Sequence, residues 1–440
     1  MTERKINSER LACTKSASDY QKHWFSDFRR RAIENGEPYV IADGAAPMEL
    51  CHVMDIPVVS TVWYSAVISA KKLSPRYFDL ADRLGYHQGL PRYVSLPLFS
   101  TLDNDPETAA YGGLPKPMMI LSRFRGDYSQ RIFQQWADAY GVPHFAIDCS
   151  SVEHIGDRWW DRNEYGWEEL FETHRIDHQV KQLEGLIRVL ETLSGRTFDY
   201  NEFAVQMHRV NEAAEITKAI SDRLATADRL AVAIPDQLHN VMAPTWHRGS
   251  EWSVQHLKDY QREVEGRIDS GYAICEDEGP RLIWINNGLW HDTAYYRAFE
   301  EQYGAVFAWS MYTNFFADGY RRYFTDDPLR ALAARHLTVN EQLHLPGYMN
   351  TWVAEQARFH RADGAVTIIS EGDRGQSTAS AFTRLELERI GVPVLELTAN
   401  VVDARLWDGA AMREVTSKFI EERVLPRSRA RKAGRGDPAS

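Results

Sequence analysis

Charged side chains directly follow two segments that the sequence predicts to be strands. These segments, residues 116–122 (KPMMILS) and 364–370 (GAVTIIS), are short and apolar. The charged residues that follow them are Arg123, Arg125, Glu371, Asp373 and Arg374. Arginine binds phosphate through its fork of N–H donors, and a carboxylate can transfer protons. The alternative is a network of ion pairs that only fills space, because buried charges must be paired.

The elements that would position these loops alternate between strand and helix. Helical periodicity separates the short apolar runs, for example at residues 128–140 and 378–390. The predicted strands are residues 39–41, 56–61, 116–122, 144–148, 281–286, 305–310, 364–370 and 392–397. Such alternation predicts parallel sheets with crossover helices. We therefore expect an α/β fold with two Rossmann-like or flavodoxin-like parallel-sheet domains.

Between these two domains the pattern changes to long helices. Residues 176–193 and 200–224 repeat apolar side chains at helical spacing. The predicted organisation is an N-terminal helical arm (1–35), a first α/β domain (36–160), a helical region (161–275), a second α/β domain (276–425) and a disordered basic tail (426–440). Ligands of parallel sheets bind beyond the carboxyl ends of the strands. That rule selects the loops after Ser122, Asp148, Asn286, Ser310 and Ser370.

Composition and charge exclude several classes of protein. The chain of 440 residues has a net charge of −11, and no basic face stands out before its C-terminus, so duplex nucleic acid is an unsuitable partner. The N-terminal residues are polar and carry no secretory signal. Apolar stretches are far shorter than the roughly 20 residues that span a bilayer. We expect a cytoplasmic protein that does not enter a membrane.

Familiar catalytic motifs are absent from the sequence. It contains no phosphate-binding P-loop, no G-x-G-x-x-G after a strand, no G-x-S-x-G and no H-E-x-x-H. Its four cysteines, Cys13, Cys51, Cys149 and Cys275, are far apart in sequence. We therefore predict neither a disulfide framework nor a metal site in this chain.

Several segments, taken in order, carry a family resemblance. Each motif is short, but together they extend over nearly the whole chain. They are residues 47–57 (PMELCHVMDIP, a form of P-x-E-L-x-x-x-x-x-x-P), 116–122, 243–271 (beginning APTWHRGSEW), 310–323 (SMYTNFFADGYRRY), 327–332 (DPLRAL), 362–370 (ADGAVTIIS) and 391–406 (GVPVLELTANVVDARL). The chain resembles the B-type subunit of benzoyl-CoA reductase and, more loosely, the D-component of 2-hydroxyglutaryl-CoA dehydratase.

This resemblance implies an assembly as well as a fold. Family members consist of two α/β domains plus helices and pair with a homologous subunit, as heterodimers or heterotetramers. They act on an acyl-CoA thioester in anaerobic aromatic or acid metabolism. Three cysteines of a subunit hold a [4Fe–4S] cluster, and a separate ATP-dependent activator protein supplies the electron.

The chain departs from the family at the cluster ligands. The positions equivalent to the three cysteines are occupied here by Pro91, Gly126 and Gly372. An iron–sulfur cluster needs thiolates, which neither proline nor glycine provides. We therefore expect no cofactor in this chain, and a [4Fe–4S] cluster only in a partner subunit.

By the resemblance, the loops at the vacated positions would converge on one cleft. The predicted catalytic residues are Glu371 and Asp373. The predicted substrate-binding residues are Ser122, Arg123, Arg125, Arg248, Tyr312 and Arg374. Arginines would bind phosphate or the thioester oxygen. Arg248 could instead support the entry to a helix, and Tyr312 could instead cap a strand.

Three functions are compatible with these observations. The chain could be a subunit of a reductase or dehydratase whose electrons travel through a cluster-bearing partner. It could be a non-catalytic acyl-CoA-binding or scaffold subunit. It could also be a cluster-free acyl-CoA enzyme that uses Glu371 or Asp373 for acid–base chemistry. The first two require a partner, whereas the third does not.

Overall fold

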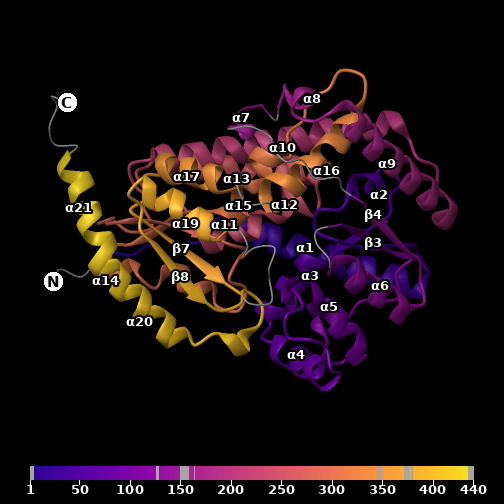
Figure 1. The fold of residues 1–440 in the computed structure, drawn as a ribbon, viewed down its shortest axis with the longest axis horizontal. Helices are drawn as coiled ribbons and strands as arrows, with labels where there is room; N and C mark the ends of the chain where they lie inside the picture. Colours follow the sequence, from indigo (N-terminus) through magenta and orange to yellow (C-terminus); the bar gives the residue numbers. More distant parts are fainter. Residues whose placement is uncertain are drawn as a thin grey trace.

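Two parallel sheets and a layer of long helices make up the protein (Figure 1). The computed structural model describes residues 4–124, 128–148, 158–162, 164–344, 349–370, 377 and 380–434. All eight predicted strands are present within this part of the chain. The α/β class with two parallel-sheet domains is therefore confirmed.

The first sheet contains four parallel strands in the order β2-β1-β3-β4. Its strands are β1 (Val40–Ala42), β2 (Val58–Ser60), β3 (Met119–Arg123) and β4 (His144–Ile147). Ile41 pairs with Val59 on one side and with Ile120 on the other. The first three strands are buried along their whole length, as expected for a sheet that is covered on both faces.

The second sheet repeats this arrangement in the order β6-β5-β7-β8. Its strands are β5 (Arg281–Ile285), β6 (Val306–Ser310), β7 (Gly364–Ile369) and β8 (Val394–Thr398). In both sheets the first strand lies between the second and the third. The chain first adds a strand on one side of this first strand and then returns to add the next strand on its other side. The point where the order reverses lies between β1 and β3 in one sheet and between β5 and β7 in the other. Ligands of open parallel sheets bind at such switch points.

Helices of the first domain cover its sheet and connect its strands. They are α2 (Met48–His52), α3 (Thr61–Ala70), α4 (Ser74–Arg83), α5 (Arg92–Asp103) and α6 (Ser129–Tyr140), with a 3-10 turn at Ala110–Gly112. Gly141 ends α6 in the left-handed conformation (φ 61°), which glycine adopts without steric cost.

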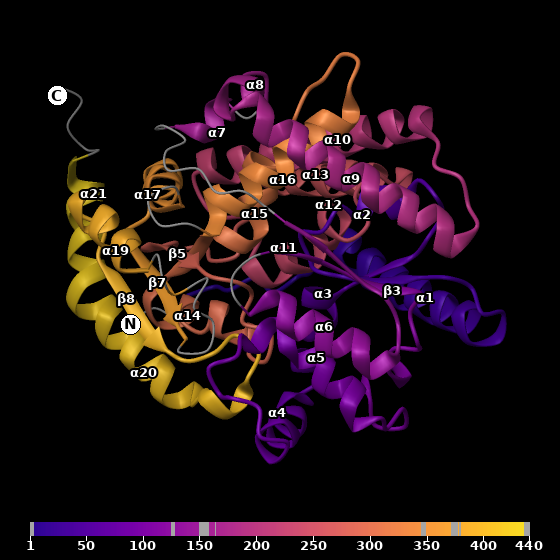
Figure 2. The same cartoon turned by 45° about the vertical axis from the view of Figure 1, so that its right-hand side comes forward.

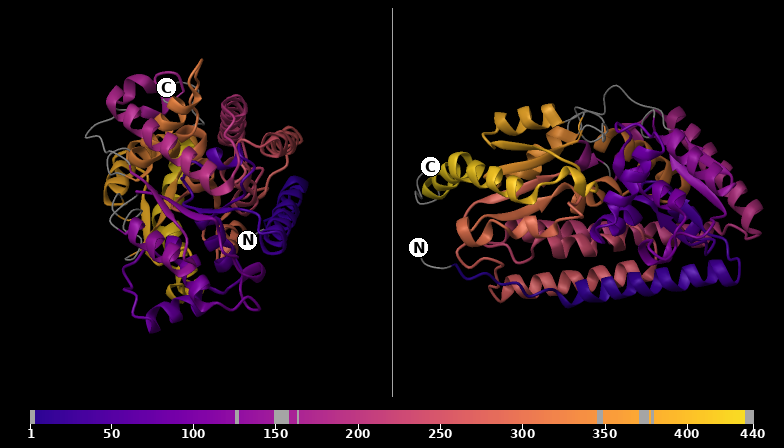
Figure 3. Two further views of the ribbon diagram at one scale, coloured as in Figure 1. Left: turned by 90° about the vertical axis from the view of Figure 1, so that its right-hand side faces the viewer. Right: turned by 90° about the horizontal axis from the view of Figure 1, so that it is seen from below.

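The helical region packs along both domains. It comprises α7 (Trp159–Arg162), α8 (Trp167–Leu170), α9 (Thr173–Ser194), α10 (Tyr200–Thr226), α11 (Ile234–Asn240), α12 (Met242–Thr245) and α13 (Glu251–Asp269). The Asp199 carboxylate caps α10 by accepting hydrogen bonds from the amides of Asn201 and Glu202. The predicted N-terminal arm forms α1 (Ala12–Glu34), which packs against α13 and α11 (Figure 3).

The second domain has the following helices. They are a 3-10 helix (Thr293–Arg297), α14 (Glu300–Tyr303), α15 (Met311–Gly319), α16 (Pro328–His344), α17 (Met349–Phe359), α19 (Ser380–Arg389), a 3-10 turn (Ala404–Leu406), α20 (Gly409–Phe419), a π-helical turn (Ile420–Val424) and α21 (Leu425–Gly434). Residues 293–303 form two short helices, the 3-10 helix and α14, rather than one continuous helix. No helix in the described part of the chain is long and apolar enough to cross a membrane.

The prediction of a disordered tail is wrong for residues 426–434. These residues lie in α21, which continues past the edge of the second sheet from α20 (Figure 2). The Arg431 guanidinium binds the fully buried Asp363 carboxylate at 2.7 and 2.8 Å, and Lys432 Nζ donates to the carbonyl of Glu278 at 2.9 Å. A buried carboxylate needs a counter-charge, so Asp363 orders a basic segment whose composition alone predicts disorder. Residues 435–440 lie outside the described residues.

Candidate functional site

A cavity lies where the switch points of the two sheets meet. From the first domain, Gly44 and Ala45 line it directly after β1, together with Tyr93 of α5. From the second domain, Asn286 and Asn287 line it directly after β5. Both domains therefore contribute the loop that follows their central strand.

Aromatic side chains form much of the cavity wall. They are Tyr93, Trp246, Tyr312, Phe315 and Tyr320. A few polar residues interrupt this wall, among them Asn286, Asn287, Thr367 and Arg384. A largely apolar cavity with few polar groups is typical of a site for an organic ligand.

The polar residues on the floor of the cavity also fix the ends of β5 and β7. The Asn286 amide donates to the carbonyl of Ile368 at 2.9 Å and accepts from the Asn287 amide at 2.7 Å. The Thr367 hydroxyl donates to the carbonyl of Ile285 at 2.7 Å. The loop after Asn286 is among those predicted from the sequence to face a ligand, whereas Asn286, Asn287 and Thr367 are not among the predicted site residues. Their signal was a pair of asparagines directly after a buried strand.

Four of the residues predicted to bind substrate are described by the structure: Ser122, Arg123, Arg248 and Tyr312. Of these four, Tyr312 lines the cavity. Tyr312 is the second residue of α15, and its ring lies 5.3 Å from that of Trp290 in an edge-to-face arrangement. Trp290 Nε1 donates to the hydroxyl of Tyr93 at 2.9 Å. Burial raises the pKa of the Tyr312 phenol well above its ordinary value, so the hydroxyl remains protonated at neutral pH.

Ser122 and Arg123 lie at the end of β3 and are fully buried. The Ser122 hydroxyl lies 2.7 Å from His144 Nε2 and donates to Gln130 Oε1 at 3.2 Å. Arg123 donates to the carbonyl of His336 in α16 at 3.4 Å, so it connects the first sheet to that helix. Neither residue is among those that line the cavity. Their role in substrate binding stays a prediction.

Arg248 lies behind the cavity wall in a buried ion-pair network. Its guanidinium donates to Glu49 Oε1 at 2.6 Å, and Arg335 reaches the same oxygen at 2.6 Å. Arg248 also donates to the carbonyls of Thr245 and Ala46. Burial alone would raise the pKa of the Glu49 carboxyl, but the two guanidinium groups outweigh burial and hold that pKa below its ordinary value.

Tyr320 connects this network to the cavity. Its ring lines the cavity, and the guanidinium carbons of Arg248 and Arg335 lie 5.6 and 4.9 Å from the ring centroid. The arrangement positions Tyr320 by cation–π contacts. Binding of a substrate phosphate by Arg248 itself stays a prediction.

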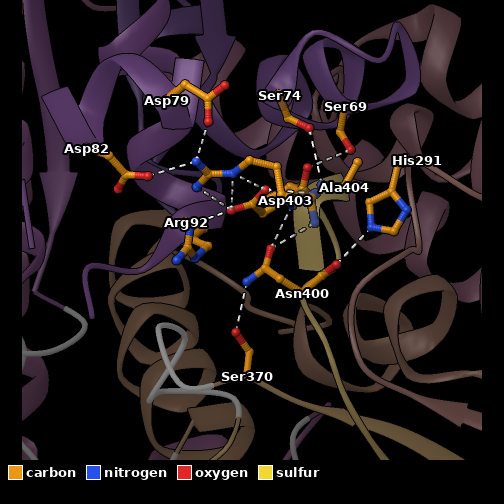
Figure 4. A network of polar contacts seen from close by, with 12 residues as sticks. Ser69, Ser74, Asp79, Asp82, Arg92, His291, Ser370, Asn400, Asp403 and Ala404 are labelled. Carbon is orange, nitrogen blue, oxygen red and sulfur yellow. Dashed lines mark hydrogen bonds and ion pairs between the residues drawn. The ribbon is translucent and has the colours of Figure 1, made fainter. Parts of the chain in front are cut away.

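A second network joins the two domains at the loop after β8 (Figure 4). The buried Asp403 carboxylate accepts hydrogen bonds from Arg92 of α5 and from Arg405. Arg405 also reaches Asp79 and Asp82 of α4, at 2.6 and 2.8 Å. These contacts fix the second domain to α4 and α5 of the first domain.

Neighbouring residues complete this interdomain clamp, which comprises residues 400–405 and their partners. The Asn400 side chain accepts from the amides of Val402 and Asp403, each at 3.0 Å, and donates to the Ser370 hydroxyl at 2.8 Å. His291 Nε2 lies 2.8 Å from the carbonyl of Asn400. Residues 400–405 end the segment 391–406 that carries the family resemblance, and they hold the two domains together.

The described residues do not provide ligands for an iron–sulfur cluster. Pro91, the residue before α5, has no donor atom in its side chain. Cys13, Cys51 and Cys275 are buried free thiols, and burial raises the pKa of each, that of Cys13 to about 12. Cluster ligation needs thiolates. No group of three or more histidine, cysteine, aspartate or glutamate side chains that could hold a metal occurs in the described part of the chain.

Six of the predicted site residues fall in segments outside the described residues. They are Arg125, Gly126, Glu371, Gly372, Asp373 and Arg374. Their proposed roles in catalysis and binding, and their equivalence to cluster ligands, stay predictions.

Comparison with known proteins shows to which family the chain belongs. The family model described as 2-hydroxyglutaryl-CoA dehydratase, D-component, matches residues 44–422. The chain is also 21% identical over 395 residues to the (R)-2-hydroxyisocaproyl-CoA dehydratase alpha subunit of Clostridioides difficile, covering 89% of this chain and 91% of that protein. The likeness to benzoyl-CoA reductase stays a prediction, while the likeness to the D-component is confirmed. The chain belongs to the 2-hydroxyglutaryl-CoA dehydratase D-component family.

Proposed function

We propose that this chain is the acyl-CoA-binding subunit of a heteromeric 2-hydroxyacyl-CoA dehydratase or benzoyl-CoA reductase-like complex, and that it holds no iron–sulfur cluster itself. The observation that carries the proposal is the cavity at the two switch points. Its residues Thr245, Trp246, Tyr312, Phe315 and Tyr320 come from the two segments 243–271 and 310–323 that carry the family resemblance.

The cavity suits the acyl end of a thioester. Aromatic rings and the side chains of Val62 and Met311 provide an apolar surface, which excludes water from the acyl group. The protonated Tyr312 can donate a hydrogen bond to a carbonyl oxygen. Redox chemistry would then belong to a homologous partner with a [4Fe–4S] cluster, supplied with electrons by an ATP-dependent activator.

A non-catalytic binding or scaffold subunit is the second candidate. It is favoured by the side-chain hydrogen bonds of Asn286 and Thr367, which are made to the protein's own backbone. The third candidate, a cluster-free acid–base enzyme, depends on Glu371 and Asp373, which lie outside the described residues.

Filling the cavity tests the binding site. Ala45 is half-buried at the cavity wall, so Ala45→Phe places a ring where the acyl group would lie. We expect the affinity for (R)-2-hydroxyisocaproyl-CoA to fall by about tenfold or more, measured by isothermal titration calorimetry. Ala411→Phe on the exposed side of α20 is the matched control. Equal affinity in both variants would reject this cavity as the acyl site.

Iron analysis tests whether the iron–sulfur cluster belongs to a partner subunit and not to this chain. The chain is purified without oxygen, alone and co-expressed with the products of its neighbouring genes, and native mass, iron and labile sulfide are measured. We expect no iron in the chain alone and an iron-containing complex with a homologue that retains the cysteines. Iron with labile sulfide in the chain alone would contradict the proposed loss of the cluster.

A further inference from the structure

A second cavity opens beside the first and shares part of its wall. This groove lies between α1, the end of α3, α11 and the segment after β5. Trp246 and Tyr312 line both the groove and the acyl cavity. The two spaces are therefore neighbours, separated by these rings and by Trp290 with its hydrogen bond to Tyr93.

Positive charge collects along the groove although the chain as a whole has a net charge of −11. Its lining includes four cationic side chains, those of Arg10, Lys22, Lys71 and Lys72. The acidic residue found among the described lining residues is Asp292. The Asp292 carboxylate is engaged by Arg413 at 2.8 Å and by Trp407 Nε1 at 3.0 Å. Lys72 donates to the carbonyl of His291, and the exposed Lys22 lies 3.7 Å from Asp19, but the cations of the lining still outnumber its described carboxylate, so the groove favours anions.

Aromatic surface accompanies this charge. Trp63 and the partly exposed Tyr111 both line the groove, and the Lys71 ammonium lies 4.5 Å from the centroid of the Tyr111 ring. A heterocyclic base stacks on such rings, while neighbouring lysines bind the phosphates attached to it.

We propose that the groove binds the phosphorylated nucleotide end of coenzyme A. The pantetheine arm would then pass beside Trp246 and Tyr312 and deliver the thioester to the acyl cavity. This inference rests on the proposed function, because it assumes that the acyl cavity receives a CoA thioester. It assigns separate parts of one ligand to the two cavities, with Lys22 and Lys71 near the phosphates.

The test compares fragments of the ligand on the full-length chain. CoA, 3′-dephospho-CoA, ADP and pantetheine are titrated by calorimetry against the natural protein and the double variant Lys22→Glu, Lys71→Glu. We expect the double variant to bind CoA at least about tenfold more weakly and to bind pantetheine unchanged. Removal of the 3′-phosphate should weaken binding to the natural protein and have little effect on the variant.

The matched control is Lys116→Glu, Lys181→Glu, which makes the same change in charge at exposed lysines outside the groove lining. Equal losses in the two double variants would assign the effect to overall charge and overturn the proposal. Unchanged CoA binding by a folded groove variant would also overturn it. ADP that binds as tightly as CoA, with no pantetheine binding, would indicate a nucleotide site unrelated to the thioester. If the natural protein binds neither CoA nor pantetheine, both this inference and the proposed function fail.

Discussion

Replacement of Glu49 by glutamine is expected to lower the free energy of unfolding by about 3–5 kcal/mol. Glu49 is fully buried, and its carboxylate is the shared counter-charge of Arg248 and Arg335, which are 1% and 3% exposed. Glutamine keeps the shape and an acceptor oxygen but removes the negative charge. The buried guanidinium groups of Arg248 and Arg335 would then lack their shared negative counter-charge. An uncompensated buried charge is among the costliest defects in a protein.

Urea unfolding followed by tryptophan fluorescence measures this loss. Glu202→Gln is the control, since Glu202 pairs with Arg209 at an exposed site (3.1 Å) and should cost at most about 1 kcal/mol. Arg335→Met should be less damaging than Arg248→Met, because Arg248 alone of these two also donates to the carbonyls of Thr245 and Ala46. A loss as small as that of the control would contradict a structural role for Glu49.

The second large effect is expected for Asp403→Asn in the interdomain clamp. The Asp403 carboxylate is inaccessible to solvent, while Arg92 and Arg405 are 11% and 24% exposed. Because water partly solvates these two partners, we expect a loss of about 2–3 kcal/mol, less than for Glu49→Gln. The loop after β8 should also detach more readily from α4 and α5.

Limited proteolysis and urea unfolding together measure the effect of Asp403→Asn. Cleavage in the clamp should accelerate in the variant, since opening of the domain interface becomes easier. The control is Asp408→Asn, five residues later, where the carboxylate caps α20 by accepting from the amides of Ala410 and Ala411. Asparagine caps helices about as well, so the control should change little. Equal behaviour of the two variants would mean that Asp403 does not hold the domains together.

The strands were predictable from sequence because each is a short, largely apolar run, and most of these runs are buried, although β4 and β8 are partly exposed. Helix α5 was not predicted, since Pro97 lies inside it and proline lacks an amide proton for the helical hydrogen bond. The order of α21 also escaped prediction. Its Arg431 binds Asp363, which lies 68 residues earlier in the chain, and composition carries no information about such a partner.

The candidate site was predictable only in part, because many of its contacts join residues that are far apart in the sequence. Tyr312 was found because it lies in a recognisable motif. The pairing of Glu49 with Arg248 joins residues 199 positions apart, and that of Arg92 with Asp403 joins residues 311 positions apart. Sequence alone shows that Arg248 is a cation beside a helix. It cannot show whether that cation faces a ligand or a buried carboxylate.

The two sheets share one strand order, and buried ion pairs connect the two domains, Arg92 with Asp403 and Glu49 with Arg335. The walls of the cavity at the switch points therefore come from both domains, and these ion pairs oppose the separation of the two domains. On the proposed route through the groove, a thioester reaches the cavity only when the side chains of Trp246 and Tyr312 rotate. On that route, rotation of these buried rings would slow both the association and the release of the ligand.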